Sequence, residues 1–189
     1  MKEWEELSSC LVHVLPDTLN IEYKFHGNQI GAWIKSFDPA GEPHAGKEIV
    51  LLGVCDGRGS WLNEGCSEGP DEIRKELFKL YANPAIVKIS DAGNIPRGNK
   101  PSDTWFVLSG LVKGIVKSGR IPVILGGGQE NTYAIYKAYE SLEQLVNLVT
   151  VDSRLDLGKL NQENESDSFL GRIILHEPNY LFNYSNLGY

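Results

Sequence analysis

Over most of the chain, short apolar runs alternate with segments in which apolar residues recur every three or four positions, as on one face of a helix. Runs typical of strands covered on both faces occur at Glu48–Val54, Ala85–Asn94, Ile121–Gly128 and Leu145–Asp156. Helices are predicted after Pro70, from about Ser102 to Ser118, and over 130–142. Because strands separated by helices usually form parallel sheets with right-handed crossovers, the pattern predicts an α/β domain with a mainly parallel sheet.

The helix after Pro70 is expected to bury an apolar face. The residues that define this face are Ile73, Leu77, Phe78 and Leu80. Proline suits the first position of a helix, and the acidic residues that follow it favour the positive end of the helix dipole.

Residues 1–46 lack the pattern of predicted strands separated by predicted helices that the rest of the chain shows. They are too short to bury a core of their own, so they are predicted to be a lead-in or cap to a domain spanning 47–189. Within them, Asn20–His26 alternates, with Ile21, Tyr23 and Phe25 on one side, which predicts a half-buried strand.

Composition excludes several classes of protein. The 189 residues include 18 Lys and Arg against 25 Asp and Glu, and the formal net charge of −7 argues against nucleic-acid binding. No apolar run approaches the roughly 20 residues of a membrane span, and the first residues lack a signal-peptide pattern. Three cysteines are too few for a disulfide scaffold. A cytoplasmic protein is therefore expected.

Candidate chemistry follows all four predicted strands, where parallel sheets bind ligands: at 56–68, 91–94, 126–130 and 152–156. Gly126–Gly128 precede Gln129 and a helix, so the glycines serve either a tight turn or an anion site at the helix start. In an extended backbone Asp152, Arg154 and Asp156 share one side. This trio is either a structural ion-pair cluster or a pair of carboxylates available to a metal.

Four segments in order resemble the ureohydrolase superfamily, which includes arginase, agmatinase and formimidoylglutamase. They are EGCSEGPDEIRKEL (64–77), SDAGNI (90–95), IPVILGGGQENTYAIYKAY (121–139) and VTVDSRLDL (149–157). The formimidoylglutamase-like branch is the most similar. The resemblance implies a three-layer α/β/α fold with a mainly parallel, arginase-like sheet. The strand-like end at Tyr189 suggests truncation at the C-terminus.

The resemblance also implies a chemistry and its ligands. The family hydrolyses C–N bonds of guanidino or formimino groups with two manganese ions, which lower the pKa of a bound water. Asp152 and Asp156 match metal-ligand positions, whereas Gln129 and Arg154 stand where the family has histidines. An amide is a poor donor to a transition metal, and a guanidinium has no lone pair to offer. We therefore expect Asp152 and Asp156 to be vestigial ligands that Arg154 neutralises.

The favoured hypothesis is an arginase-like domain with a degenerate metal site, no cofactor and no metal-dependent hydrolysis. Its pocket would take a small polar molecule, with Gln129, Glu130 and Arg154 as the binding residues. The residues expected at the mouth are Asp56, Arg58, Glu64, Gln129, Arg154 and Asp156. The alternative is an active hydrolase of the formimidoylglutamase type, with two Mn²⁺ ions and ligands from a missing C-terminal part. An exposed final strand would also be compatible with homo-oligomerisation.

Overall fold

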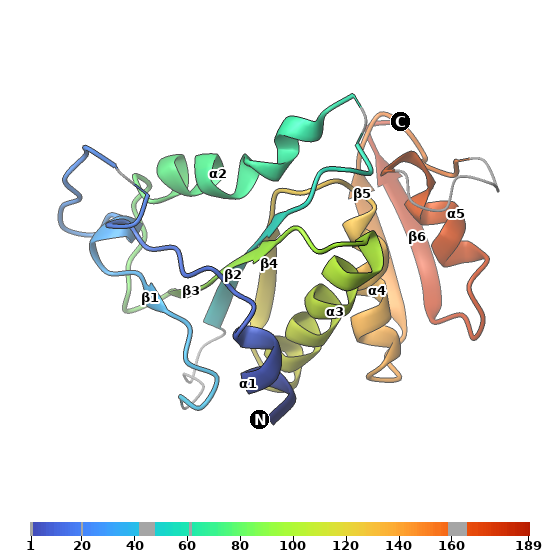
Figure 1. The fold of residues 1–189 in the computed structure, drawn as a ribbon, viewed down its shortest axis with the longest axis horizontal. Helices are drawn as coiled ribbons and strands as arrows, with labels where there is room; N and C mark the ends of the chain where they lie inside the picture. Colours follow the sequence, from blue (N-terminus) through green and yellow to red (C-terminus); the bar gives the residue numbers. More distant parts are fainter. Residues whose placement is uncertain (1, 20, 42–47, 61, 159–165) are drawn as a thin grey trace.

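A computed structural model gives the arrangement of most of the chain. It describes residues 2–19, 21–41, 48–60, 62–158 and 166–189. The predicted boundary between residues 46 and 47 therefore lies outside the described residues. The described residues form two parallel sheets with helices packed against them (Figure 1).

The larger sheet has the strand order β1-β3-β2-β4, and every neighbouring pair is parallel. Its strands are β1 (Lys35–Ser36), β2 (Glu48–Cys55), β3 (Lys88–Pro96) and β4 (Ile121–Leu125). The central strand, β2, is almost entirely buried, as expected for an apolar strand with neighbours on both sides and cover on both faces.

The smaller sheet pairs β5 (Val146–Val151) with β6 (Leu181–Leu187), again in parallel. Helices α4 (Asn131–Glu140) and α5 (Phe169–Ile174) pack against one face of this pair. The structure confirms the four predicted strands as β2 to β5 and the strand-like end of the chain as β6. The predicted strand Leu145–Asp156, however, ends at Val151.

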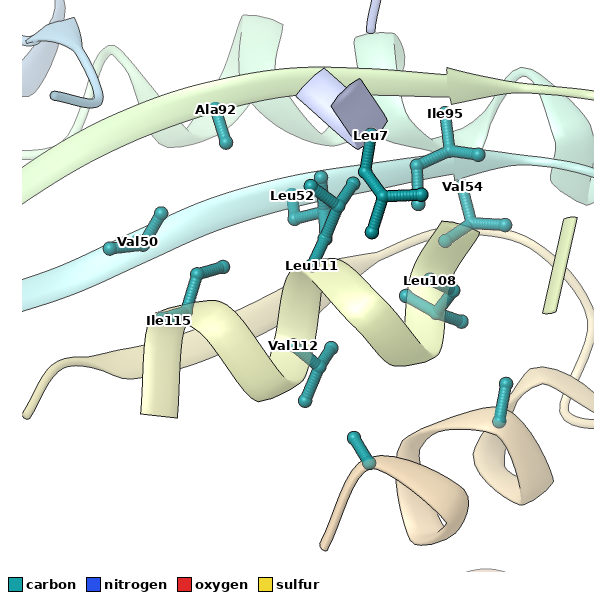
Figure 2. Packing of buried hydrophobic residues seen from close by; sticks show 12 residues of the cluster. Leu7, Val50, Leu52, Val54, Ala92, Ile95, Leu108, Leu111, Val112 and Ile115 are labelled. Atoms are coloured by element: carbon teal, nitrogen blue, oxygen red, sulfur yellow. The ribbon is translucent and has the colours of Figure 1, made fainter. Parts of the chain in front are cut away.

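One face of the larger sheet packs against α1 (Lys2–Ser8), α3 (Pro101–Lys117) and α4. Figure 2 shows side chains of α3 pointing toward those of β2, with Leu7 of α1 beside them. A Cβ atom on Gly110 would lie 2.3 Å from a methyl carbon of Leu7. Helix α1 can therefore approach α3 closely because this position of α3 has no side chain.

The opposite face of the larger sheet is covered by the end of α2 (Gly69–Leu77) and by the chain before β1. The buried residues there include Val14, Leu19, Ile30, Ile34, Leu51 and Phe78. Helices and sheet therefore form three layers, as the α/β prediction requires.

The strand predicted at Asn20–His26 is wrong for its described part. Residues 21–26 form neither helix nor strand, although Ile21 and Phe25 pack against the buried cluster around Phe78. Alternating apolar residues indicate contact with an apolar surface, whereas a strand also needs a backbone partner. Here the outer edge of β3 pairs with β1 instead.

Helix α2 buries a charged residue where sequence spacing predicts apolar ones. Ile73 is 43% exposed and Leu80, beyond the helix, is 58% exposed, whereas Arg74 is fully buried. The Arg74 guanidinium donates to both carboxylate oxygens of Asp91, at 2.8 and 2.9 Å, and to Oδ1 of Asn94 at 2.6 Å. These bonds attach α2 to β3 and satisfy a charge that would otherwise be costly to bury.

Among the described residues, no helix has the length and hydropathy needed to cross a lipid bilayer.

Substitution of Arg74 tests the role of the buried pair. We expect Arg74→Ala to lower the free energy of unfolding by about 3–5 kcal/mol, because it leaves the Asp91 carboxylate buried without its cation. The control is Lys75→Ala, which removes only an exposed ion pair with Glu72 and should lower the free energy of unfolding far less. Urea denaturation at neutral pH measures both, and equal losses would contradict this role.

Candidate functional site

The segments that follow β2, β4 and β5 meet around a pocket of about 350 Å³. Parallel strands place their carboxyl ends at one edge of a sheet, which explains why these loops come together. The lining residues are Gly59, Ser60, Leu62, Asn63, Cys66, Gly127, Gly128, Gln129, Asp152, Ser153, Arg154, Asp156, Ser166 and Asp167. Four predicted site residues, Gln129, Asp152, Arg154 and Asp156, therefore do share one pocket.

Gln129 and Asp152 connect the two sheets across this pocket. The Gln129 amide Nε2 donates to Oδ2 of Asp152 at 2.6 Å, although the residues follow strands in different sheets. The backbone N–H of Arg154 donates to the other oxygen of Asp152 at 3.0 Å. Both bonds favour the ionised carboxylate and lower the pKa of Asp152, the bond from Gln129 most strongly.

Asp156 is buried beside Asp152 with its backbone in the left-handed region, at φ 43°. Aspartate tolerates this conformation better than most residues. Burial raises the pKa of Asp156, and the negative charge of Asp152 raises it further. Two carboxylates thus lie close together in the lining of the pocket, where a proton or another cation would relieve their repulsion.

The predicted charge-neutralised trio is wrong. Strand β5 ends at Val151 and the backbone bends, so Asp152, Arg154 and Asp156 do not alternate along one extended segment. Arg154 is exposed, and its guanidinium forms no ion pair with any residue that the structure describes. It lines the pocket and acts on the two carboxylates only at longer range.

Glu130 lies behind the pocket and does not line it. Its carboxylate accepts a hydrogen bond from Ser166, whose hydroxyl also pairs with that of Ser60. Burial raises the pKa of Glu130, although the bond from Ser166 opposes the shift. Glu130 therefore positions two pocket-lining hydroxyls, a role different from the direct ligand contact expected from sequence.

The glycine turn serves close packing. The N–H of Gly127 donates to the carbonyl of Cys66 at 3.0 Å, and that of Gly128 donates to the carbonyl of Asp56 at 3.1 Å. A Cβ on Gly126, where φ is +65°, would lie 2.3 Å from Pro70. Since these two N–H groups bind protein carbonyls, the turn matches its tight-turn interpretation and not an anion site.

Three residues expected at the mouth do not line the pocket. Asp56 is buried and forms an ion pair with Arg58 at 2.6 Å. Asp56 accepts a hydrogen bond from the Thr104 hydroxyl of α3, and Arg58 donates one to the carbonyl of Gly98, just before α3. Burial alone would raise the pKa of Asp56, but the bonds from Arg58 and Thr104 hold it below its ordinary value. Glu64 is exposed in a short 3-10 helix.

Ser60, Cys66 and Ser166 line the pocket without any sequence signal. Ser60 and Cys66 are close together in the sequence, but Ser166 lies 106 positions after Ser60, so only the tertiary structure brings it to them. Among the described residues, no three His, Cys, Asp or Glu side chains form a group that could hold a metal ion.

A family model for the arginase family matches residues 47–181, more than half of the chain. The chain belongs to the arginase family. A formimidoylglutamase from Corynebacterium efficiens is 30% identical over 182 residues, which cover 92% of this chain and 56% of that protein. One from Streptococcus gordonii is 29% identical over 164 residues, covering 80% and 49%.

Solved structures of the arginase family show the same fold. Formimidoylglutamase from Bacillus subtilis superposes with a TM-score of 0.74 over 89% of this chain and 55% of its own, at 18% identity. Arginase from Medicago truncatula superposes with a TM-score of 0.65 over 75% and 50%, at 23% identity. These matches confirm the predicted arginase-like fold. The chain spans about half the length of the curated relatives it matches.

The buried carboxyl of Glu130 predicts a pH dependence of stability. Its raised pKa means that, above about pH 4.5, the unfolded chain releases this proton before the folded arginase-family domain does. Relative to Glu130→Gln, the wild type should lose stability as pH rises above 4.5, by at most about 1.4 kcal/mol per pH unit. Denaturant unfolding between pH 4.5 and 7.5 measures the difference. Glu22→Gln, at an exposed position, is the control, and parallel curves for wild type and Glu130→Gln would refute the prediction.

Arg154 is expected to contribute little to folding. Because its side chain is exposed and unpaired among the described residues, Arg154→Ala should change the free energy of unfolding by no more than about 0.5 kcal/mol. Arg58→Ala is the comparison, since it removes the cation from buried Asp56 and should cost about 3 kcal/mol. Similar losses for the two variants in thermal or urea unfolding would show that Arg154 forms a structural pair.

Proposed function

We propose that this arginase-family domain binds a small polar cation in its pocket and does not carry out manganese-dependent hydrolysis. The observation that carries the proposal is the 2.6 Å hydrogen bond between the Gln129 amide and Asp152. The family resemblance places metal ligands at these two positions. The amide N–H of Gln129 takes up one of the lone pairs through which the Asp152 carboxylate could bind a metal, and it is itself a donor that offers no lone pair.

The remaining side chains also fit a manganese pair poorly. Arg154 is a permanent cation at a position where the resemblance implies a histidine, and it has no lone pair for a metal. Of the matched ligand positions, only Asp152 and Asp156 offer carboxylates, and Mn²⁺ requires several oxygen or imidazole donors. The residues of this chain therefore do not fit a pair of manganese ions.

The charge of the pocket favours a cationic ligand. Asp152, Asp156 and Asp167 line it against one guanidinium, that of Arg154. A planar guanidinium or amidinium group can form paired N–H bonds to a carboxylate, and the hydroxyls of Ser60 and Ser166 add polar contacts. A volume of about 350 Å³ suits a small molecule.

One observation favours the alternative function, an active hydrolase of the formimidoylglutamase type. Asp152 and Asp156 are both present and lie close enough for the charge of one to raise the pKa of the other. A related formiminoglutamase from Trypanosoma cruzi was solved with Mn²⁺. Activity in this protein would require further metal donors from outside the described residues.

Metal content and hydrolysis separate the two functions. After incubation with Mn²⁺ and removal of the excess, we expect well under one manganese ion per chain and no hydrolysis of formiminoglutamate, agmatine or arginine. Introducing Gln129→His together with Arg154→His should raise the bound manganese, because both changes supply imidazole donors. Two ions per unmodified chain, or turnover that depends on manganese, would overturn the proposal.

Ligand binding is tested by calorimetry with agmatine and arginine in metal-free buffer. Asp156→Asn should weaken binding at least about tenfold, since it removes one buried negative charge from the pocket. Asp17→Asn removes an exposed charge elsewhere and serves as the matched control. Absence of binding to the unmodified chain, or equal affinities for both variants, would contradict a cation-binding pocket.

A further inference from the structure

We propose that a groove on the outer surface of helices α3 and α4 binds a small aromatic carboxylate. This α3–α4 groove is lined by residues from positions 102–113 of α3, by residues from positions 133–141 in and just after α4, and by Leu7 of α1. It has a volume of about 290 Å³ and shares no lining residue with the pocket that contains Asp152 and Asp156. Binding in the groove is therefore separate from the function proposed for that pocket.

The groove lies on the side of α3 that faces away from the larger sheet, where α4 runs beside it (Figure 1). The α3 residues that line it recur every three or four positions, at 102, 105, 106, 109, 110 and 113, and so share one face of the helix. Leu108, Leu111 and Ile115 lie on the opposite face, which packs against the sheet (Figure 2). The groove is therefore outside the core of the sheet.

One end of the groove is aromatic. Trp105 and Tyr133, near the starts of α3 and α4, have ring centroids 6.1 Å apart, and the neighbouring Phe106 is 71% exposed. The Arg172 guanidinium of α5 lies over both rings, 4.7 Å from the Trp105 centroid and 4.0 Å from that of Tyr133, without lining the groove. The Tyr133 hydroxyl also pairs with Nδ1 of His176 at 3.2 Å. Since these contacts fix the rings before a ligand arrives, binding has less entropy to lose.

The other end of the groove carries two ammonium groups. Lys113 and Lys137 lie about one to two helical turns beyond the aromatic residues of their helices. The Lys137 ammonium pairs with Glu140 at 2.6 Å and with Nε2 of His176 at 3.0 Å, and its third N–H remains for a ligand. Among the described residues that line the groove, none is an Asp or Glu. A chain with a net charge of −7 thus presents lysines and no carboxylate here.

The two ends together specify the class of ligand. Aromatic side chains pack against another ring edge-to-face or in offset stacks, and ammonium groups form charge-assisted hydrogen bonds to a carboxylate. Along α4, Tyr133 and Lys137 are about 6 Å apart, because a helix rises about 1.5 Å per residue. The ligand that fits is therefore a single ring joined to a carboxylate by a short aliphatic chain, and a volume of about 290 Å³ leaves little room for more.

The probe for the experiment is 3-phenylpropionate, and 3-phenylpropionamide is its neutral counterpart of the same shape. Each compound is titrated into the ¹⁵N-labelled 189-residue chain, and amide chemical shifts are followed by NMR. We expect 3-phenylpropionate to shift signals from positions 102–113 and 133–141. It should bind at least about fivefold more tightly than the amide, because only the anion gains from the two ammonium groups.

A charge variant separates the lysines from the rings. Lys113→Gln should weaken binding of 3-phenylpropionate by about fivefold and leave binding of the amide unchanged. Lys117→Gln makes the same charge change on the same helix, at an exposed position outside the groove, and should alter neither affinity.

An aromatic variant tests the other end. Phe106→Ser should weaken both compounds, since both place a ring against it, whereas Tyr81→Ser, at a 74% exposed position elsewhere, should weaken neither. Urea unfolding of each variant shows that it is folded. Four results would overturn the proposal: no shifts at millimolar 3-phenylpropionate, shifts confined to residues around Asp152, equal affinities for acid and amide, or equal effects of Lys113→Gln and Lys117→Gln.

Discussion

Parallel pairing of β2 with β3 on one side and β4 on the other is the constraint on which the rest of the structure depends. It directs the end of each strand to one edge, so every loop with candidate chemistry begins there. The pairing of β2 with β3 requires the Asn94 side chain to lie close to the backbone of Gly53. A Cβ on Gly53 would lie 1.9 Å from the Asn94 side chain, which in turn binds buried Arg74. Backbone pairing and the buried guanidinium thus support the same three elements, α2, β2 and β3.

The electrostatics of the pocket follow from unequal environments of similar groups. Asp152 receives two hydrogen bonds and its pKa falls, whereas Asp156 is buried beside that charge and its pKa rises. Glu130 is buried deeper and acts through Ser166. A pocket with this arrangement attracts a cation, yet its nearest amide and guanidinium are poor metal ligands. The attraction for a cation and the poor fit to a metal both arise because these neighbouring side chains differ in burial and in hydrogen bonding.

Helix α4 has a second role besides covering the sheet. Its residues contribute to the core of both sheets, so it keeps β4 and β5 near each other although no backbone pairing joins them. The hydrogen bond from Gln129 to Asp152 closes the same region at the carboxyl ends. The pocket therefore lies at the junction of two sheets.

The amino-acid sequence alone determined the order of strands and helices from β2 to β5, and the final strand β6, because the spacing of apolar residues shows which faces of a local segment are buried. It did not predict helix α5, which lies between β5 and β6. It also determined the family, through four segments that keep their order. The tertiary structure decided which charges are buried: Arg74 replaced the expected Ile73 in the interior, and Arg154 remained outside the predicted trio. It likewise brought Ser60 and Ser166 together, residues 106 positions apart. Spacing along a chain describes neighbours on one element, whereas side-chain pairs between elements depend on how those elements pack.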